Sequence, residues 1–140
     1  MSTTQPIRSK QLLHDFKEYF LTKQPNSRNY TLILIGLNTA LRINDILHLT
    51  WGDVYCTEHS RFYTHLLITE KKTEKETRIL INRELQETLL SYRKTQPSIA
   101  DTDYLFPSPR KADSPLSRYQ AYRIVRKAAE AVGIEDRKSV

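Results

Sequence analysis

Arg42 is the residue of this sequence whose chemistry depends most on a partner. It lies in the segment NTALRINDIL (38–47), where Leu41, Ile46 and Leu47 recur at roughly helical spacing. A guanidinium beside core residues is costly to desolvate unless an anion meets it. Its planar fork of donors can bind two oxygens of one anion. The sequence therefore indicates an anionic partner for Arg42, and the residues around it leave the identity of that anion open.

Further cations lie in a charged segment and on a predicted helix near the end of the sequence. The segment EKKTEKE (70–76) is too charged for a core and has the length of a hairpin loop. The helix sets its basic residues opposite its apolar side, where they suit phosphate contacts. A solvated surface is the simpler alternative for both sets, and Glu130 on that helix favours it. The cations concerned are Lys71, Lys72, Lys75, Arg123, Arg126 and Lys127.

The composition narrows the class of protein. A chain of 140 residues with 39% hydrophobic and 27% charged residues is long enough for one globular domain with a real core. Three glycines and one cysteine argue against a Gly-rich phosphate loop, a zinc finger or a disulfide framework. Cys56 alone indicates a reduced thiol in a cytoplasmic protein, and the histidines show no metal-ligand spacing. We expect neither a metal nor a cofactor.

The charge balance favours a polyanionic partner. The net charge is +6 and the pI is near 9.5, which suits nucleic acid; a protein with a mildly basic surface is the alternative. No apolar segment approaches the roughly 20 residues of a membrane span, so no membrane partner is expected.

Hydrophobic periodicity predicts helices around the arginine. Ser9 can cap a first helix that carries Leu12, Leu13, Phe16 and Phe20. A second helix, capped by Ser27 and apolar almost all round, should lie at the domain centre and stop near Leu41. A short third helix, Asp45 to Leu49, follows with Asn44 as its cap. Arg42 is therefore expected in the turn between two helices.

The remaining segments predict a small sheet and two more helices. WGDVYC, residues 61–69 and residues 77–81 read as three antiparallel strands, and Asn82 can cap the next helix. Leu105 and Phe106 should anchor a long connection, which ends where Ser114 caps a last helix that stops at Gly133. Its core side is expected to comprise Ala121, Ile124, Val125, Ala128 and Val132, opposite Tyr119 and the cations. We predict an α+β fold, mostly helical with a three-stranded sheet, as a single domain over residues 1–140.

The order of these parts closely resembles the catalytic domain of tyrosine recombinases, the phage-integrase family. The resemblance runs from about Pro6 to Ile134. The segments that carry it are T-A-L-R-I-N-D-I-L, L-T-W-G-D-V, K-K-T-E-K-E in a strand turn, Y-L-F-P-S and S-R-Y-Q-A-Y-R-I-V-R-K-A-A-E-A-V-G-I. It implies site-specific DNA recombination through a phosphotyrosine intermediate, without ATP or a metal. It also implies double-stranded DNA and other recombinase protomers as partners, and no small-molecule substrate.

The resemblance assigns roles to individual residues. Arg42 matches the first catalytic arginine, which binds the scissile phosphate, and Asp45 matches a nearby acidic position that helps order the site. Lys72 matches the lysine that reaches into the minor groove and can protonate the 5′ oxygen that leaves. Lys71 and Lys75 are close competitors for this role.

The sequence departs from the family after the last predicted helix. A working member has an H-x-x-R box, then a second His or Trp, then the nucleophilic tyrosine. The last histidine here is His65, and Tyr119 and Tyr122 lie upstream of where the box is expected. We interpret the chain as the N-terminal portion of a catalytic domain, a truncated fragment that should keep some DNA affinity and lack strand-transfer activity. The alternatives are a natural non-catalytic DNA-binding module and a basic interaction domain with no nucleic-acid role.

Overall fold

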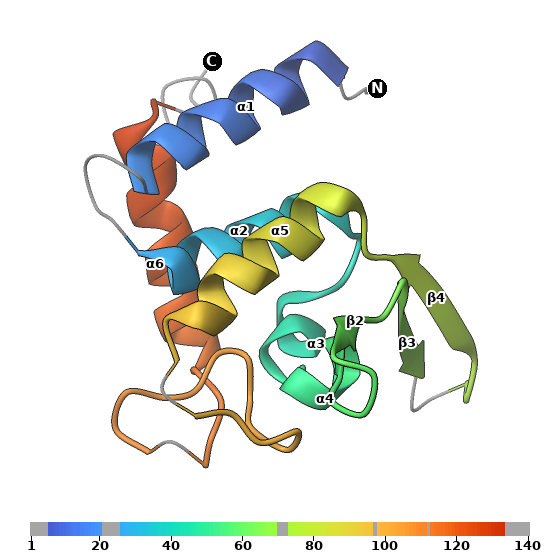
Figure 1. Ribbon diagram of the computed structural model, residues 1–140. Helices are drawn as coiled ribbons and strands as arrows, with labels where there is room; N and C mark the ends of the chain where they lie inside the picture. Colours follow the sequence, from blue (N-terminus) through green and yellow to red (C-terminus); the bar gives the residue numbers. More distant parts are fainter. Residues whose placement is uncertain (1–5, 21–25, 70–72, 97, 112, 134–140) are drawn as a thin grey trace.

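The computed structural model describes residues 6–20, 26–69, 73–96, 98–111 and 113–133 (Figure 1). Within them, the helices and strands confirm the α+β class. The helices are α1 (Pro6–Glu18), α2 (Ser27–Asn38), α3 (Ile43–Leu47), α4 (Trp51–Val54), α5 (Arg83–Lys94) and α6 (Arg118–Ala131). The strands are β1 (Tyr55–Cys56), β2 (Arg61–Phe62), β3 (His65–Thr69) and β4 (Glu76–Leu80).

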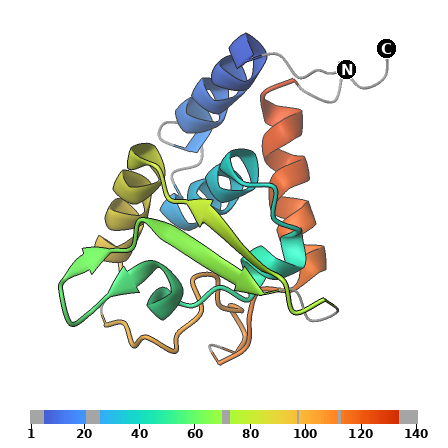
Figure 2. The ribbon, with the colours of Figure 1, turned by 90° about the vertical axis from the view of Figure 1, so that its right-hand side faces the viewer.

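Helix α2 occupies the centre of the helical part. Figure 2 shows it between α5 and α6, with α1 above. Its residues 30–35 are all buried, which confirms the prediction of a central, nearly all-apolar helix. α5 packs along α2, and α3 packs against both α2 and α6. The segment that follows α2 is therefore held between packed helices.

The predicted three-stranded sheet is instead two separate two-stranded antiparallel sheets, β1–β2 and β3–β4. Residues 61–69, which were expected to form one strand, divide at Tyr63 and Thr64. The Tyr63 amide donates to the Val54 carbonyl over 2.8 Å, whereas the Thr64 carbonyl accepts from Ile81 at 2.8 Å. WGDV itself is helical, because Thr50 and Asp53 form a capping box at its start.

Helices α2 and α6 begin at side-chain caps that lie next to or after the predicted ones. Asn26, not Ser27, caps α2, and its side chain accepts from the Asn29 amide at 3.0 Å. Ser117, not Ser114, caps α6 in a capping box with Gln120. The reason at α6 is tertiary, because the Leu116 amide donates to the Phe106 carbonyl over 2.7 Å and delays the helix.

The other helix ends agree with the sequence in part. Asn82 caps α5 and Gly133, with φ +84°, follows α6, as predicted. Helix α1 begins at Pro6, so Ser9 lies inside it, and α3 begins at Ile43, before the predicted cap Asn44.

The long connection before α6 is anchored as predicted. Leu105 and Phe106 are fully buried, and the Tyr92 hydroxyl donates to the Leu105 carbonyl. The Leu105 amide donates to the Leu49 carbonyl over 2.9 Å, so this connection also holds the segment between α3 and α4. None of the described helices is long and apolar enough to cross a membrane.

Candidate functional site

The backbone of Arg42 takes part in the structure of α3, whereas its side chain is exposed. Its backbone is extended (φ −71°, ψ 152°) at the N-cap position of α3, and its carbonyl oxygen accepts from Ile46 at 3.1 Å. The flanking Leu41 and Ile43 pack against the core. Within the described part of the chain, the guanidinium forms no hydrogen bond or ion pair. Arg42 thus lies in the turn between α2 and α3, as the sequence predicts, with its side chain exposed.

The turn before Arg42 is fixed by several hydrogen bonds. At the end of α2, the Thr39 amide and hydroxyl both donate to the Ile35 carbonyl, at 3.0 and 2.8 Å. Asn38 accepts from the Asn82 side chain at 2.8 Å, which joins the end of α2 to the start of α5. A guanidinium on such a support loses little backbone freedom when it binds an anion.

Asp45 lies in the first turn of α3 and is half-buried. A carboxylate there interacts favourably with the positive end of the helix dipole. Neighbouring Asn44 is exposed, and Nδ1 of His48 lies 2.8 Å from its carbonyl oxygen. Asp45 lies three residues after Arg42, and its role in ordering the Arg42 turn stays a prediction.

The structure describes only one of the three hairpin lysines. The ladder between β3 and β4 ends at the pair Thr69 and Glu76. Lys71 and Lys72 lie outside the described residues, whereas Lys75 is exposed and its amide donates to the Thr73 hydroxyl over 3.2 Å. Which of the three lysines approaches Arg42 stays a prediction.

The cations of α6 lie on its exposed side. Arg123, Arg126 and Lys127 are exposed, whereas Ala121 and Ala128 on the opposite side are fully buried. The predicted core side is wrong at Val125, which is 36% exposed, because the part of α6 that faces the core is narrower than expected.

The sequence did not predict a hollow in which Arg123 and Lys127 lie near a third cation, Arg28. Arg28, Arg123 and Lys127 line a hollow of about 260 Å³ between α2, α6 and the connection before α6, and none of the described residues that line it is acidic. Arg28 is the second residue of α2, and Arg42 follows the other end of this helix of 12 residues, which is about 18 Å long. Among the described residues, Arg42 and the hollow are therefore separate positive regions. The sequence alone does not indicate Arg28, because its place depends on the approach of α6 to the start of α2.

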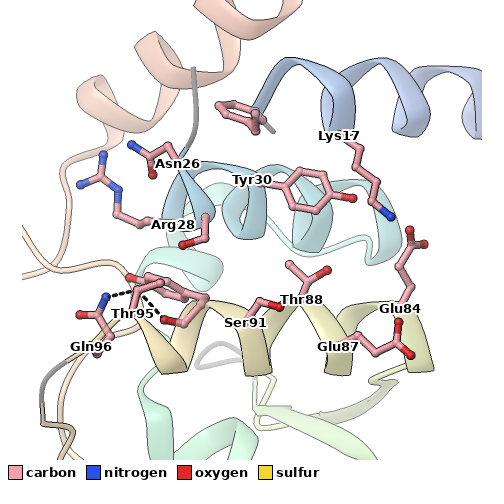
Figure 3. Close-up of a pocket in the computed structure, with 13 residues that line it drawn as sticks. Lys17, Asn26, Arg28, Tyr30, Glu84, Glu87, Thr88, Ser91, Thr95 and Gln96 are labelled. Atoms are coloured by element: carbon pink, nitrogen blue, oxygen red, sulfur yellow. Dashed lines mark hydrogen bonds between the residues drawn. The ribbon is translucent and has the colours of Figure 1, made fainter. Parts of the chain in front are cut away.

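A second cavity, lined by described residues, is separate from Arg42. It measures about 790 Å³ and lies between α1, α2 and α5, with Lys17, Glu84 and Glu87 at its rim (Figure 3). Burial raises the pKa of Tyr30 and of Tyr92 to about 12, and the Tyr30 hydroxyl has no hydrogen-bond partner within the described residues. A raised pKa disfavours the phenolate form of both tyrosines.

Comparison with known sequences defines the class of protein. Residues 5–139 match the model of the phage integrase family. The chain is 43% identical over 136 residues to the probable integrase/recombinase YoeC of Bacillus subtilis (strain 168), which covers 97% of this chain and 68% of that protein. The chain belongs to the phage integrase family, which confirms the resemblance.

Solved structures show the same fold. The crystal structure of XerA recombinase matches 95% of this chain with a TM-score of 0.67 and 19% identity. The Tn1549 transposon integrase (residues 82–397), in complex with circular intermediate DNA, matches 93% with a TM-score of 0.55 and 19% identity. The chain spans 42% and 45% of those two structures.

Proposed function

We propose that this chain supplies the phosphate-binding part of a tyrosine recombinase, which cleaves and rejoins double-stranded DNA through a phosphotyrosine intermediate. One observation carries the proposal: Arg42 is held at a fixed turn, yet its guanidinium is exposed and has no partner among the described residues. Family membership supplies the chemistry to which such an arginine belongs. The guanidinium binds two non-bridging oxygens of the scissile phosphate and stabilises the charge that grows on them.

The neighbouring residues support this role. Asp45, in the first turn of α3, helps to order the Arg42 turn. A lysine of the β3–β4 turn, Lys72 with Lys71 and Lys75 as competitors, protonates the leaving 5′ oxygen. The exposed cations of α6 bind the DNA backbone and fix the orientation of the duplex. The partners are double-stranded DNA and further recombinase protomers.

The attacking group is not among these 140 residues. They contain no H-x-x-R box after His65, and Tyr119 and Tyr122 belong to α6, before the place where that box is expected. We therefore expect the 140-residue chain alone to bind DNA and to form no covalent adduct with it. A polypeptide that also carries the box and the tyrosine forms the adduct.

Titration of a labelled duplex tests the proposed DNA partner. The chain should bind at low salt with little sequence preference, and affinity should fall steeply as salt rises, because phosphate contacts release counterions. Replacing Arg123, Arg126 and Lys127 together by Ala should weaken binding about tenfold or more and lower the salt slope by roughly 2.7, about 0.9 for each contact.

The matched control removes the same charge elsewhere. It replaces Lys10, Lys94 and Arg110, which are all exposed, by Ala. This variant should lose much less affinity if the α6 cations lie at the DNA. Equal losses in the two triple variants, or no binding at low salt, would contradict the proposal.

A further inference from the structure

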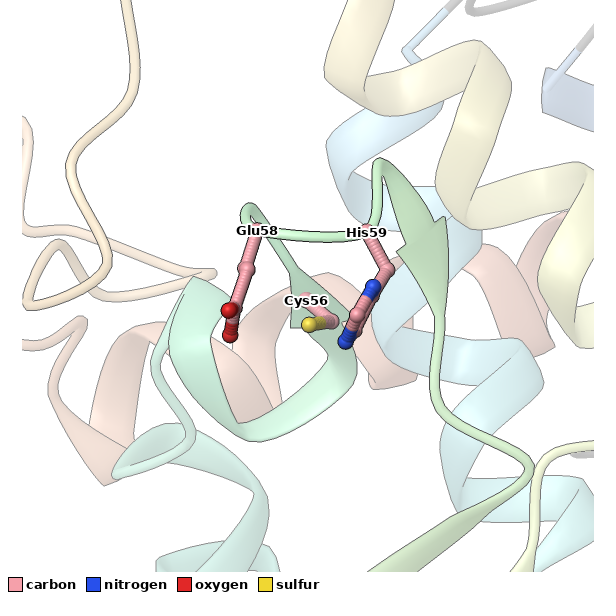
Figure 4. A group of neighbouring side chains, drawn as sticks. All are labelled: Cys56, Glu58 and His59. Carbon is pink, nitrogen blue, oxygen red and sulfur yellow. The ribbon is translucent and has the colours of Figure 1, made fainter.

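The turn between β1 and β2 gathers three side chains that share an ability to bind metal. Cys56 ends β1, and Glu58 and His59 belong to the turn that leads to β2. Figure 4 shows all three side chains directed to the same side of this turn. The turn closes with Ser60 at a φ of 53°, and the Ser60 amide donates to the Thr57 carbonyl over 3.3 Å. Its backbone shape, not regular spacing, brings the three residues together.

The distances suit a small ion. The Cys56 sulfur, a Glu58 carboxylate oxygen and a His59 ring nitrogen all lie within 4.8 Å of one another. Tetrahedral zinc with ordinary bond lengths needs ligand atoms about 3.3–3.8 Å apart. Closing the remaining ~1 Å requires only side-chain rotation. Glu58 and His59 are exposed, so their rotations meet little resistance, whereas the half-buried Cys56 side chain is hydrogen-bonded to that of Tyr63 and stays close to its position.

The backbone that carries the three ligands is anchored to the rest of the domain. The Thr57 hydroxyl donates to the Asp101 carboxylate over 2.7 Å, and the Asp101 carbonyl accepts from Gly52 at 2.9 Å. At the base of the turn, Tyr55 packs edge-on against Phe62 with ring centres 4.9 Å apart. Ligands on such a support need little ordering when an ion binds, which favours affinity.

We propose that Cys56, Glu58 and His59 form a zinc site, with a water molecule as the fourth ligand. Thiolate, imidazole and carboxylate are the ligand types that zinc takes, and three protein ligands plus water is a known coordination for this ion. The Cys56 thiol releases its proton to solvent as the sulfur binds. The site includes neither Arg42 nor the α6 cations, so it is independent of the proposed DNA chemistry.

Cobalt substitution and zinc competition test the site in the full 140-residue chain, kept reduced with a phosphine. Cobalt(II) should bind one to one and give the sulfur-to-cobalt charge-transfer absorption in the near ultraviolet, and zinc should displace it. Cys56→Ser should abolish that absorption. Glu58→Gln and His59→Gln should keep it and weaken zinc affinity about tenfold or more each, because each removes one ligand.

The controls are His14→Gln and Glu130→Gln, which change the same residue types at exposed positions on α1 and α6. They should bind zinc like the unaltered chain, and circular dichroism should show the same helix content in every variant. Absence of the charge-transfer absorption overturns the proposal. So does an affinity loss confined to Cys56→Ser, which would reveal a lone thiolate in place of a three-ligand site.

Discussion

At Arg42 the backbone and the side chain have different environments. The carbonyl oxygen takes part in the first turn of α3, and both neighbours pack on the core, while the guanidinium is exposed. Binding an anion there needs no rearrangement of the turn, so most of the interaction energy is available to the ligand. The same arrangement means that the side chain contributes little to folding. A residue of this kind is free to serve binding alone.

A buried residue illustrates the opposite case. The Tyr92 side chain is 2% exposed, and its hydroxyl donates to the Leu105 carbonyl. Tyr92→Phe should lower the free energy of unfolding by about 1–3 kcal/mol, because a buried carbonyl loses its donor. Urea denaturation measures the free energy of unfolding of each variant. The control Tyr122→Phe, at a side chain 52% exposed, should change it by less than about 0.5 kcal/mol. Similar losses in both variants would show that the buried hydrogen bond contributes nothing.

At the scale of elements, several features follow from local sequence alone. The apolar run of α2 predicts its burial, Asn82 predicts the start of α5, and Leu105 with Phe106 predicts the anchor of the long connection. These features depend on periodicity and on side chains that bond to nearby backbone. The place of Arg42 at a turn between helices is predictable for the same reason.

Other features depend on contacts between distant segments. The start of α6 is set by the bond from Leu116 to Phe106, and the break before β3 is set by the bond from Tyr63 to Val54. The hollow that contains Arg28 exists only because α6 packs near the start of α2. The grouping of Cys56 with His59 depends on the turn conformation at Ser60. Sequence periodicity carries no information on such contacts.

The two serines before α6 give a matched test of capping. Ser117 accepts from the Gln120 amide at 3.1 Å, whereas Ser114 takes part in hydrogen bonds through its backbone. Ser117→Ala should therefore lower the free energy of unfolding by about 1 kcal/mol, and Ser114→Ala should lower it by less than about 0.5 kcal/mol. Thermal and urea unfolding measure both. A larger loss at Ser114 would place the start of α6 three residues earlier than described here.

At the scale of the whole molecule, the positive regions lie at the two ends of α2. Arg42 follows its last residue, and Arg28 near its first residue joins the hollow lined by Arg123 and Lys127. The central helix thus sets the separation between the two regions. An extended polyanion can contact both at once, which a small anion cannot. This arrangement favours a duplex as the partner.

The pH dependence of stability is also a property of the whole domain. Burial raises the pKa of Tyr30 and of Tyr92 from 10.0 to about 12 in the folded chain. The unfolded chain then loses these protons first, so the stability they contribute is complete below pH 10 and is lost as pH rises towards about 12. The melting temperature should fall across this interval. In Tyr92→Phe the fall should be smaller, and an equal fall in that variant would assign the pH dependence to other groups.

Duplex binding by Arg42 variants over a range of salt concentrations tests the central claim most directly. Arg42→Ala should fold normally, bind about tenfold more weakly and lose roughly 0.9 of the salt slope, because one phosphate contact disappears. Arg42→Lys should keep the slope but recover only part of the affinity, since an ammonium lacks the planar fork. Arg110→Ala, at an exposed arginine of the long connection, should match the unaltered chain. If Arg42→Ala binds like Arg110→Ala, with the same affinity and slope, Arg42 does not bind DNA phosphate.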